Sequence, residues 1–237
     1  MKNKTNKIIS IIFIALELCL YIMILFLPKY IPYKYPAYIS ILLAFAFSLF
    51  QIKNKDMFFE IVALCFTLVS DTFLVMVEPQ NKLFGMIFFL VVQIAHMLYI
   101  HNYLTKKEQI ISLSIRLGLM VISSVACVLV LKKNTDAVSI LSMLYITNLV
   151  INIVFSFYKS KKLLLFAIGL VLFILCDINV GMSVLIDNYI SVSSDSLIYQ
   201  IFHPNFNVIW MFYVPSQTLI TLNVLFSKPL FNKTITE

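Results

Sequence analysis

Long apolar blocks, separated by short polar segments, run through the whole chain. Each block holds roughly 16–23 residues, which is enough for an α-helix to cross a hydrocarbon layer of about 30 Å. We therefore predict a bundle of about eight transmembrane helices in one domain that spans residues 1–237. The predicted spans are 8–27, 37–52, 57–77, 83–104, 111–131, 138–158, 163–185 and 207–226.

The composition agrees with this pattern. Hydrophobic residues make up 61% of the 237 positions and charged residues 12%, whereas a soluble domain carries about 25% charged residues. The net charge of +7 does not indicate nucleic-acid binding, because the lysines gather at the ends of the apolar blocks and form no basic face. The sequence predicts an all-α, multi-pass integral membrane protein among membrane lipids, in the cell membrane if the source is bacterial. It does not indicate an oligomeric state.

The lysines also predict the topology, because cytoplasmic loops are enriched in positive charge. On one side of the bundle the termini and loops hold twelve lysines, and the opposite loops hold five. Both termini are therefore expected in the cytoplasm. The segment 186–206 is the one long connection, and it is expected to form a re-entrant or surface segment. The twelve are Lys2, Lys4, Lys7, Lys53, Lys55, Lys106, Lys107, Lys159, Lys161, Lys162, Lys228 and Lys233.

Two aspartates interrupt the apolar blocks at depth. Asp71 and Asp177 each lie fourteen residues after the start of their predicted span. A charged side chain at such depth costs several kcal/mol, on the order of 3 kcal/mol at a helix centre, so it marks a candidate functional site. Both spans run in the same direction, which places the two carboxyl groups at the same depth in the outer half of the bilayer.

Other polar residues recur at steps of three, four or seven, which keeps them on one helix face. Because an unpaired amide or carboxyl group that faces lipid costs free energy, we expect these faces to point inward and to line a shared polar cavity. Ser, Thr, Asn and Gln also serve as interhelical hydrogen-bond partners, and that alternative stays open for each single residue. The faces comprise Glu60, Thr67 and Asp71; Gln93, His96, Tyr99 and Tyr103; Tyr145, Asn148, Asn152 and Ser156; Gly169, Phe173, Asp177 and Gly181; and Trp210, Tyr213, Gln217 and Thr221.

Three further charged residues lie inside predicted spans. Glu17 is central in the first span, where we expect a protonated carboxyl group packed into the bundle. Glu60 is near the inner end of its span and is expected to reach headgroup water. Arg116 is expected to extend its long side chain to the cytoplasmic interface.

Several classes of chemistry are excluded. The three histidines are scattered and form no His-x₃-His or HExxH pattern, so no metal site is predicted. A nucleophile elbow and a P-loop are both missing, and four glycines do not suffice for a glycine-rich phosphate loop. No cofactor is expected. The four cysteines lie in apolar blocks and are expected to act as small apolar side chains.

The remaining candidate is the carboxyl pair. When two carboxyl groups are buried close together, one can stay protonated while the other ionises, which supplies an acid and a base at neutral pH. Such pairs suit hydrolysis that is started by protonation and passes through a cationic intermediate. In a membrane the substrate would be a lipid.

The residues around the aspartates resemble a known family. Ser70-Asp71 is followed by Gly85, Phe89, His96 and Tyr99, and later come FILCD, ending at Asp177, and YVPSQ, from Tyr213 to Gln217. This order and spacing, over roughly Ala37 to Leu225, resembles the YhhN-like membrane family, which includes the lysoplasmalogenases. The chain departs from it at Ser70, where that family usually has glycine.

The resemblance implies an ether hydrolase that cleaves the vinyl-ether bond of a lysoplasmalogen, or a related lysophospholipid ether, to a fatty aldehyde and a glycerophospho-base. It implies Asp71 and Asp177 as the catalytic residues of an aspartate dyad. His96, Tyr99, Tyr213 and Gln217 would orient the carboxyl groups or bind the substrate. A rise of about 1.5 Å per residue places His96 roughly 10 Å nearer the cytoplasm than Asp71.

The sequence bears on three other functions. A proton- or cation-coupled small-solute transporter would use the same aspartates, but it predicts helices broken at mid-span, and only Pro215 fits. An intramembrane aspartyl protease is disfavoured, because its Gly-x-Gly-Asp and Pro-Ala-Leu signatures are missing. A non-catalytic lipid-binding or scaffold protein stays open.

Overall fold

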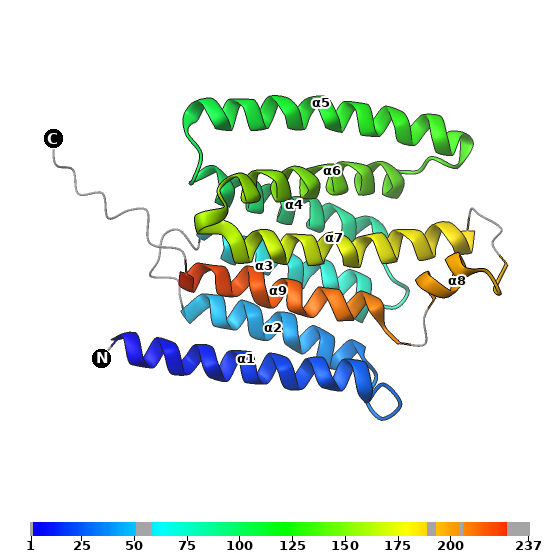
Figure 1. Cartoon of the computed structure of the whole chain (residues 1–237). Helices are drawn as coiled ribbons and strands as arrows, with labels where there is room; N and C mark the ends of the chain where they lie inside the picture. The colour runs from blue at the N-terminus through cyan, green and yellow to red at the C-terminus, as the bar shows by residue number, and fades with distance from the viewer. Residues whose placement is uncertain (1, 51–57, 189–192, 204–205, 227–237) are drawn as a thin grey trace.

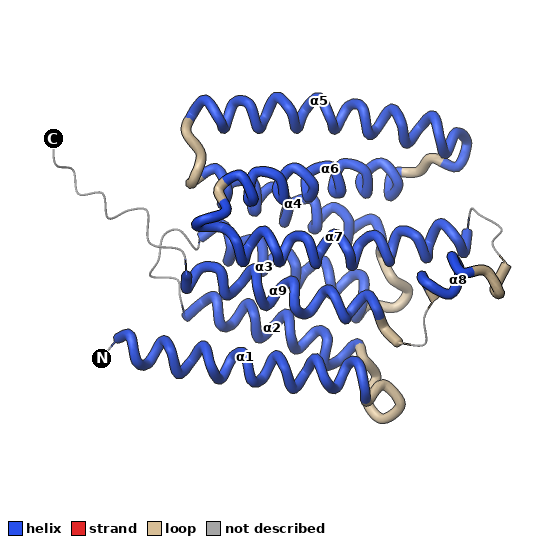
Figure 2. Tube along the Cα trace, in the orientation of Figure 1, coloured by secondary structure: helices blue, strands red, loops and turns tan. Residues whose placement is uncertain are grey.

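The computed structural model describes residues 2–50, 58–188, 193–203 and 206–226, and this part of the chain is all-α, with helices running side by side (Figures 1 and 2). Each predicted span corresponds to one long helix. The α3 helix continues into a π-helical turn, Thr72–Met76. The long helices are α1 (Lys2–Phe26), α2 (Lys34–Phe50), α3 (Phe58–Asp71), α4 (Lys82–His101), α5 (Lys106–Leu131), α6 (Ala137–Tyr158), α7 (Ser160–Asn188) and α9 (Val208–Phe226).

Six of these helices are long and apolar enough to cross a membrane: α1, α3 with its π-turn, α4, α5, α6 and α7. Helix α2 is apolar but shorter. The start of α1 and the end of α9 lie at the same end of the bundle (Figure 1). The count of eight membrane crossings and the cytoplasmic placement of that end stay predictions.

Polar caps at the loops determine where several helices begin. The Thr105 hydroxyl accepts from the backbone N–H of Glu108, whose carboxylate in turn accepts from the backbone N–H of Thr105, which forms a capping box. Asp136 caps α6 by accepting from the backbone N–H of Ser139. These bonds satisfy N–H groups that the first helical turn leaves free.

The segment 186–206 is partly a surface helix. Helix α7 runs on to Asn188, and the short α8 (Leu197–Phe202) follows with no buried residue. Residues 189–192 and 204–205 lie outside the described part, as do Lys53, Lys55, Lys228 and Lys233 of the topology argument.

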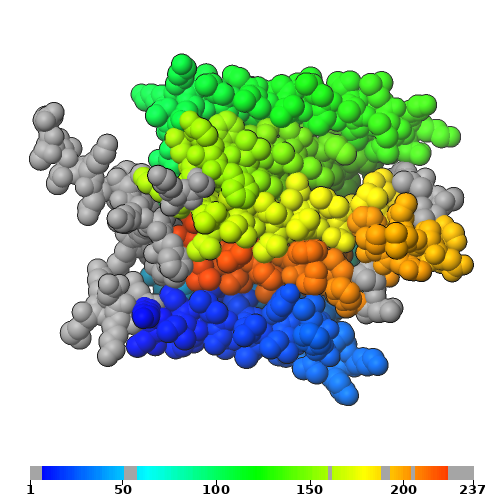
Figure 3. All heavy atoms as spheres, viewed as in Figure 1, coloured from blue at the N-terminus to red at the C-terminus, as the bar shows by residue number. Residues whose placement is uncertain are grey.

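The helices at the two edges present apolar side chains outward. Helix α5 packs against α6, and α1 packs against α2 and α9, so each leaves one face uncovered (Figure 3). On α5, for example, Val121 and Val130 are 65% and 76% exposed. Such an uncovered apolar face suits acyl chains better than water.

Helices α7 and α9 pack closely against one another at Gly169. A Cβ atom on this residue would lie 2.7 Å from Cγ1 of Ile220 and 3.0 Å from the backbone oxygen of Ser216. Glycine at a helix interface lets two backbones come this near. The contact holds together the two helices that carry Asp177 and Tyr213.

We expect Gly169→Ala to separate α7 from α9 and to destabilise the protein by about 1–3 kcal/mol, the usual cost of overpacking. Gly118→Ala is the matched control, because nothing lies within 4 Å of a Cβ at Gly118; it should be neutral or stabilising by up to about 1 kcal/mol. Thermal unfolding in detergent measures both. Equal effects of the two variants would contradict the close packing at Gly169.

Candidate active site

Asp71 lies where α3 changes its hydrogen-bonding pattern. It is the last α-helical residue, and in the π-turn that follows the N–H of Val77 donates to the carbonyl of Thr72. Single π-helical turns inside α-helices are often found at functional sites. The Thr72 hydroxyl lies 2.9 Å from the Tyr38 hydroxyl on α2, which ties this turn to a second helix.

Each aspartate pairs with a tyrosine from another helix. The Tyr213 hydroxyl on α9 donates to Oδ2 of Asp71 over 2.7 Å. The Tyr145 hydroxyl on α6 donates to Oδ2 of Asp177 over 2.5 Å. Asp71 is 3% exposed, whereas Asp177 on α7 is only partly buried. The hydroxyl groups replace part of the hydration that a carboxyl group loses in an apolar bundle.

The two aspartate–tyrosine pairs converge on one place. Asp71 and Asp177 are close enough to interact electrostatically, and Cys176 interacts with both. The ring of Phe173 contacts both tyrosines, with centroid distances of 6.3 Å to Tyr145 and 5.4 Å to Tyr213. We call Asp71, Asp177, Tyr145 and Tyr213 the aspartate–tyrosine cluster.

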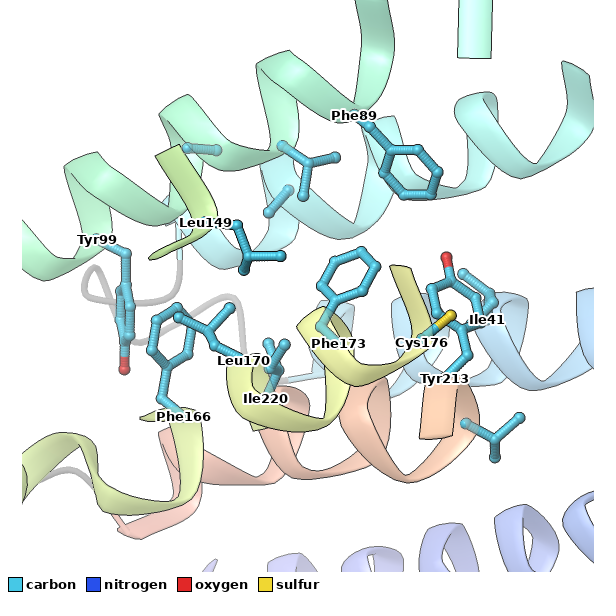
Figure 4. Packing of buried hydrophobic residues seen from close by; sticks show 14 of the residues in the cluster. Ile41, Phe89, Tyr99, Leu149, Phe166, Leu170, Phe173, Cys176, Tyr213 and Ile220 are labelled. Atoms are coloured by element: carbon cyan, nitrogen blue, oxygen red, sulfur yellow. The ribbon is translucent and has the colours of Figure 1, made fainter. Parts of the chain in front are cut away.

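His96 and Tyr99 lie in another layer of the bundle. Nε2 of His96 is 3.9 Å from a carboxylate oxygen of Glu60, and its ring packs against Phe166 at 5.2 Å. The Tyr99 hydroxyl accepts from Asn223 over 3.0 Å, and its ring also packs against Phe166. Figure 4 shows Tyr99 and Phe166 at one end of the core, and Cys176 and Tyr213 at the other, with Phe173 between them.

Gln217 is the fourth predicted binding residue. It follows Tyr213 by one helical turn on α9 and is 2% exposed. Its Nε2 donates to no other group within the described part of the chain. The structure therefore brings Tyr213 to the aspartates and places Gln217 one turn from it, while His96 and Tyr99 accompany Glu60 and Asn223.

The inward orientation of the polar faces is confirmed for most of their residues, because these residues are buried. Gly181, in contrast, is exposed. Where these faces meet, several of their side chains bond one another directly, and the shared polar cavity stays a prediction. Two surface hollows of the described part of the chain have no lining from either aspartate. The larger, of about 310 Å³, lies between the outer part of α7, α8 and the start of α9, with Asn179, His203 and Asn207 in its lining.

Two predictions for other charged residues are wrong. Arg116 does not extend to the interface: it is 5% exposed and donates to Asn148 and Asn152 of α6, because their side chains supply acceptors nearby. Glu60 does not reach headgroup water, because it is fully buried beside His96.

The sequence missed two other interactions. Glu17 is buried as expected, but it has a partner, because the Ser40 hydroxyl donates to it over 2.5 Å. Tyr145 was placed on an inward face without a role in the site; its position in line with Asn148 and Asn152 was the available signal. Among the described residues, no group of three or more His, Cys, Asp or Glu side chains is arranged to hold a metal ion.

The fold and the site define an all-α protein whose helices are suited to a membrane and whose interior holds a pair of carboxyl groups. The chain matches the family model of the YhhN family over residues 30–224, which is most of its length. It belongs to the YhhN family. Comparisons with curated proteins and with solved structures gave no match.

Ser70, the departure from the family pattern, has a clear role. Its hydroxyl donates over 2.7 Å to the carbonyl oxygen of Gly85 on α4, and the residue is fully buried. The bond joins α3 to α4 directly beside Asp71.

We expect Ser70→Ala to lower the free energy of unfolding by about 0.5–1.5 kcal/mol, because the carbonyl group of Gly85 loses a donor from another helix. The control is Ser142→Ala, whose hydroxyl bonds the carbonyl group of Val138 in its own helix; its effect should stay within about 0.5 kcal/mol. Thermal unfolding in detergent compares them. A smaller loss for Ser70→Ala than for the control would contradict the assigned role.

Proposed function

We propose that the protein is a membrane-embedded ether hydrolase that acts on lysoplasmalogens or a related lysophospholipid ether. The products are a fatty aldehyde and a glycerophospho-base. The observation that carries the proposal is the pair of carboxyl groups inside the bundle, Asp71 and Asp177, which interact with one another and each accept a hydrogen bond from a tyrosine. Membership of the YhhN family is consistent with a membrane hydrolase.

The chemistry of a vinyl ether fits such a pair. Protonation of the alkene carbon remote from oxygen gives an oxocarbenium ion, water then adds, and the hemiacetal collapses to aldehyde and alcohol. One carboxyl group supplies the proton, and the other, as a carboxylate, stabilises the cation and takes a proton from water. Both steps need a carboxylic acid and a carboxylate side by side, which two interacting carboxyl groups inside an apolar bundle supply.

The other predicted site residues take supporting roles in this proposal. Tyr213 orients the carboxyl group of Asp71. Gln217 offers a buried donor one turn away for a polar group of the substrate. His96 and Tyr99 contact a more distant part of the lipid, because they lie nearer the α4–α5 end of the bundle.

The alternative is a proton- or cation-coupled transporter that uses the same aspartates. Two observations bear on it: Pro215 lies inside α9, and the α-helical pattern of α3 ends at Asp71. Interrupted helices at mid-bundle are typical of transporter sites.

We expect purified protein to release aldehyde from a lysoplasmalogen and to leave a lysophospholipid with an acyl chain intact. Asp71→Asn and Asp177→Asn should each lower kcat by about 10²–10⁴-fold, the usual contribution of a general acid or base. Asp136→Asn is the matched control, because Asp136 caps α6 outside the site and asparagine caps equally well.

The measurement is aldehyde production, with unfolding temperatures confirming that each variant folds. No aldehyde from the wild-type protein would contradict the proposal, and proton-driven solute uptake in vesicles would then favour the transporter.

A further inference from the structure

We infer that the larger surface hollow, between α7, α8 and the start of α9, binds the headgroup of the lysophospholipid substrate. Asn207 and His203 contact the phosphate, and Asp187 accepts from the amine of the base. This headgroup site rests on the proposed function and deepens it, because it positions the lipid over the aspartate–tyrosine cluster. Figure 1 shows α8 beside the end of α7 and the start of α9.

The hollow has the size and the mixed lining of a ligand site. Its volume is about 310 Å³, with polar groups from Asn179, His203 and Asn207 and apolar surface from Phe202 and Ile209. Small-molecule sites combine apolar walls with a few polar groups that orient the ligand. A lysophospholipid presents both kinds of surface together, since its phosphate lies close to the start of its hydrocarbon chain.

The wall that α8 forms is fixed to α7 by hydrogen bonds. The Ser183 hydroxyl donates over 3.1 Å to the carbonyl oxygen of Phe202. One residue further, Nε2 of His203 lies 3.1 Å from Oδ1 of Asp187. The His203 ring also stacks on the ring of Tyr199, with centroids 4.2 Å apart. These contacts hold His203 in place in the lining of the hollow.

The exposed side chains of α8 place the hollow at the level of the lipid headgroups. Leu197, Ile198 and Ile201 are 72%, 53% and 52% exposed. A surface helix with an exposed apolar face lies at the boundary between headgroups and acyl chains. Tyr199 on α8 and Trp210 at the start of α9 agree with this level, because Tyr and Trp are enriched at the membrane interface.

The distance from the hollow to the aspartates matches the length of the substrate. Ile209 lines the hollow and precedes Tyr213 by one helical turn on the same face of α9, a rise of about 6 Å. Tyr213 in turn bonds Asp71. Five bonds join the phosphorus of a lysoplasmalogen to its vinyl-ether oxygen, which spans about 6 Å in an extended chain. A phosphate in the hollow therefore brings the vinyl ether to the level of the aspartates.

The donors at the hollow suit a phosphate. Oδ1 of Asn207 accepts from the backbone N–H of Trp210 over 3.3 Å, which leaves the Nδ2 of Asn207 to donate to a ligand. The nitrogens of His203 face two oxygens that only accept, Oδ1 of Asp187 and the carbonyl oxygen of Tyr199. Both bonds form together only when both nitrogens carry a proton, so this arrangement favours a positively charged ring.

The acceptors suit the other polar groups of the headgroup. The Asp187 side chain is 55% exposed, so the carboxylate that bonds His203 remains accessible to the amine of the base. Nδ2 of Asn179 donates to the carbonyl oxygen of Leu175 over 2.7 Å, which leaves Oδ1 of Asn179 to accept from the free glycerol hydroxyl. A lipid with two chains has no such hydroxyl, so this contact favours a lysolipid.

Trp210 supplies the readout, because it is the single tryptophan of the chain and its N–H bonds Asn207. The full-length protein in neutral detergent is titrated with a lysophosphoethanolamine whose chain is joined by a saturated ether, which has no alkene carbon to protonate. We expect a saturable change in Trp210 fluorescence. The alkylglycerol with the same chain and no phosphate should give none, and an equal change with both compounds would overturn the headgroup site.

A soluble headgroup separates a lipid site from a site for free phosphate esters. Glycerophosphoethanolamine, which lacks the chain, should need at least about tenfold higher concentration, because it buries less apolar surface. Saturation at the same concentration would overturn the lipid as occupant. The titration involves no cleavage, so binding without aldehyde release in the earlier assay would contradict the proposed function alone, and aldehyde release without binding would contradict the headgroup site alone.

Two variants test the phosphate contacts. Asn207→Ser keeps a helix cap and removes the amide donor, and His203→Phe keeps a ring against Tyr199 and removes both nitrogens. Each should raise the Kd about tenfold, the usual loss for a hydrogen bond to a charged group. His101→Phe is the matched control, because His101 lies at the end of α4 beside Ser112, outside the hollow; its Kd should stay unchanged.

Unfolding temperatures show which variants fold, and either of the two phosphate variants decides the matter alone. A wild-type Kd in a folded Asn207→Ser or His203→Phe protein would overturn the contact. In the aldehyde assay both variants should raise KM and leave kcat in place, as expected for a group that binds substrate and transition state equally.

Asp187→Asn tests the amine contact. Asparagine keeps an acceptor for His203 and removes the negative charge. The Kd for the ethanolamine lysolipid should rise about threefold, the size of an exposed ion pair, and the Kd for the matching lysophosphatidic acid, which has no amine, should not rise. Weaker binding of both lipids, or of neither, would overturn the placement of the amine at Asp187.

Discussion

The structure depends on one constraint: a carboxyl group inside an apolar bundle must find its hydrogen-bond partners on neighbouring helices, because lipid offers none. Asp71 and Asp177 meet this constraint with Tyr213 and Tyr145. The first bond joins α3 to α9, which are distant in sequence, and the second joins the consecutive helices α6 and α7. The same bonds that satisfy the carboxyl groups therefore hold these helices in register. The close approach of α7 and α9 at Gly169 keeps both halves of the cluster on one rigid unit.

The same constraint explains why the interior is polar in layers. One layer holds the aspartate–tyrosine cluster around Phe173. Another layer holds Glu60, His96 and Asn223 around Phe166 and Tyr99. Between α5 and α6, Arg116 bonds Asn148 and Asn152, and Asn152 in turn bonds Gln93 of α4. A protein that needed only stability would gain little from burying these charges, since hydrophobic replacements are often as stable. Their presence points to chemistry.

The sequence predicted the helices well, because a span of apolar residues is a local property of the chain. It also predicted which faces turn inward, because Asn148, Asn152 and Ser156 recur at helical spacing. The sequence did not predict the hydrogen-bond partners of these side chains. Which face of α6 meets α5 depends on packing between helices, and a single sequence does not show it. Arg116 was therefore expected at the membrane interface, whereas in the structure α6 supplies its hydrogen-bond acceptors. For the same reason Tyr145 was not recognised as the partner of Asp177, and Glu60 was expected near water. The family likeness identified Asp71, Asp177 and Tyr213 together, but it gave no bonds among them.

The central claim is that Asp71 and Asp177 act as one catalytic unit. The most direct measurement is a double-mutant cycle, with aldehyde release compared among the wild-type protein, Asp71→Asn, Asp177→Asn and the variant that carries both changes. Residues that act as a unit are strongly non-additive. The account predicts that the double variant is no slower than the slower single variant. Losses that multiply, or a single variant that keeps wild-type activity, would contradict it.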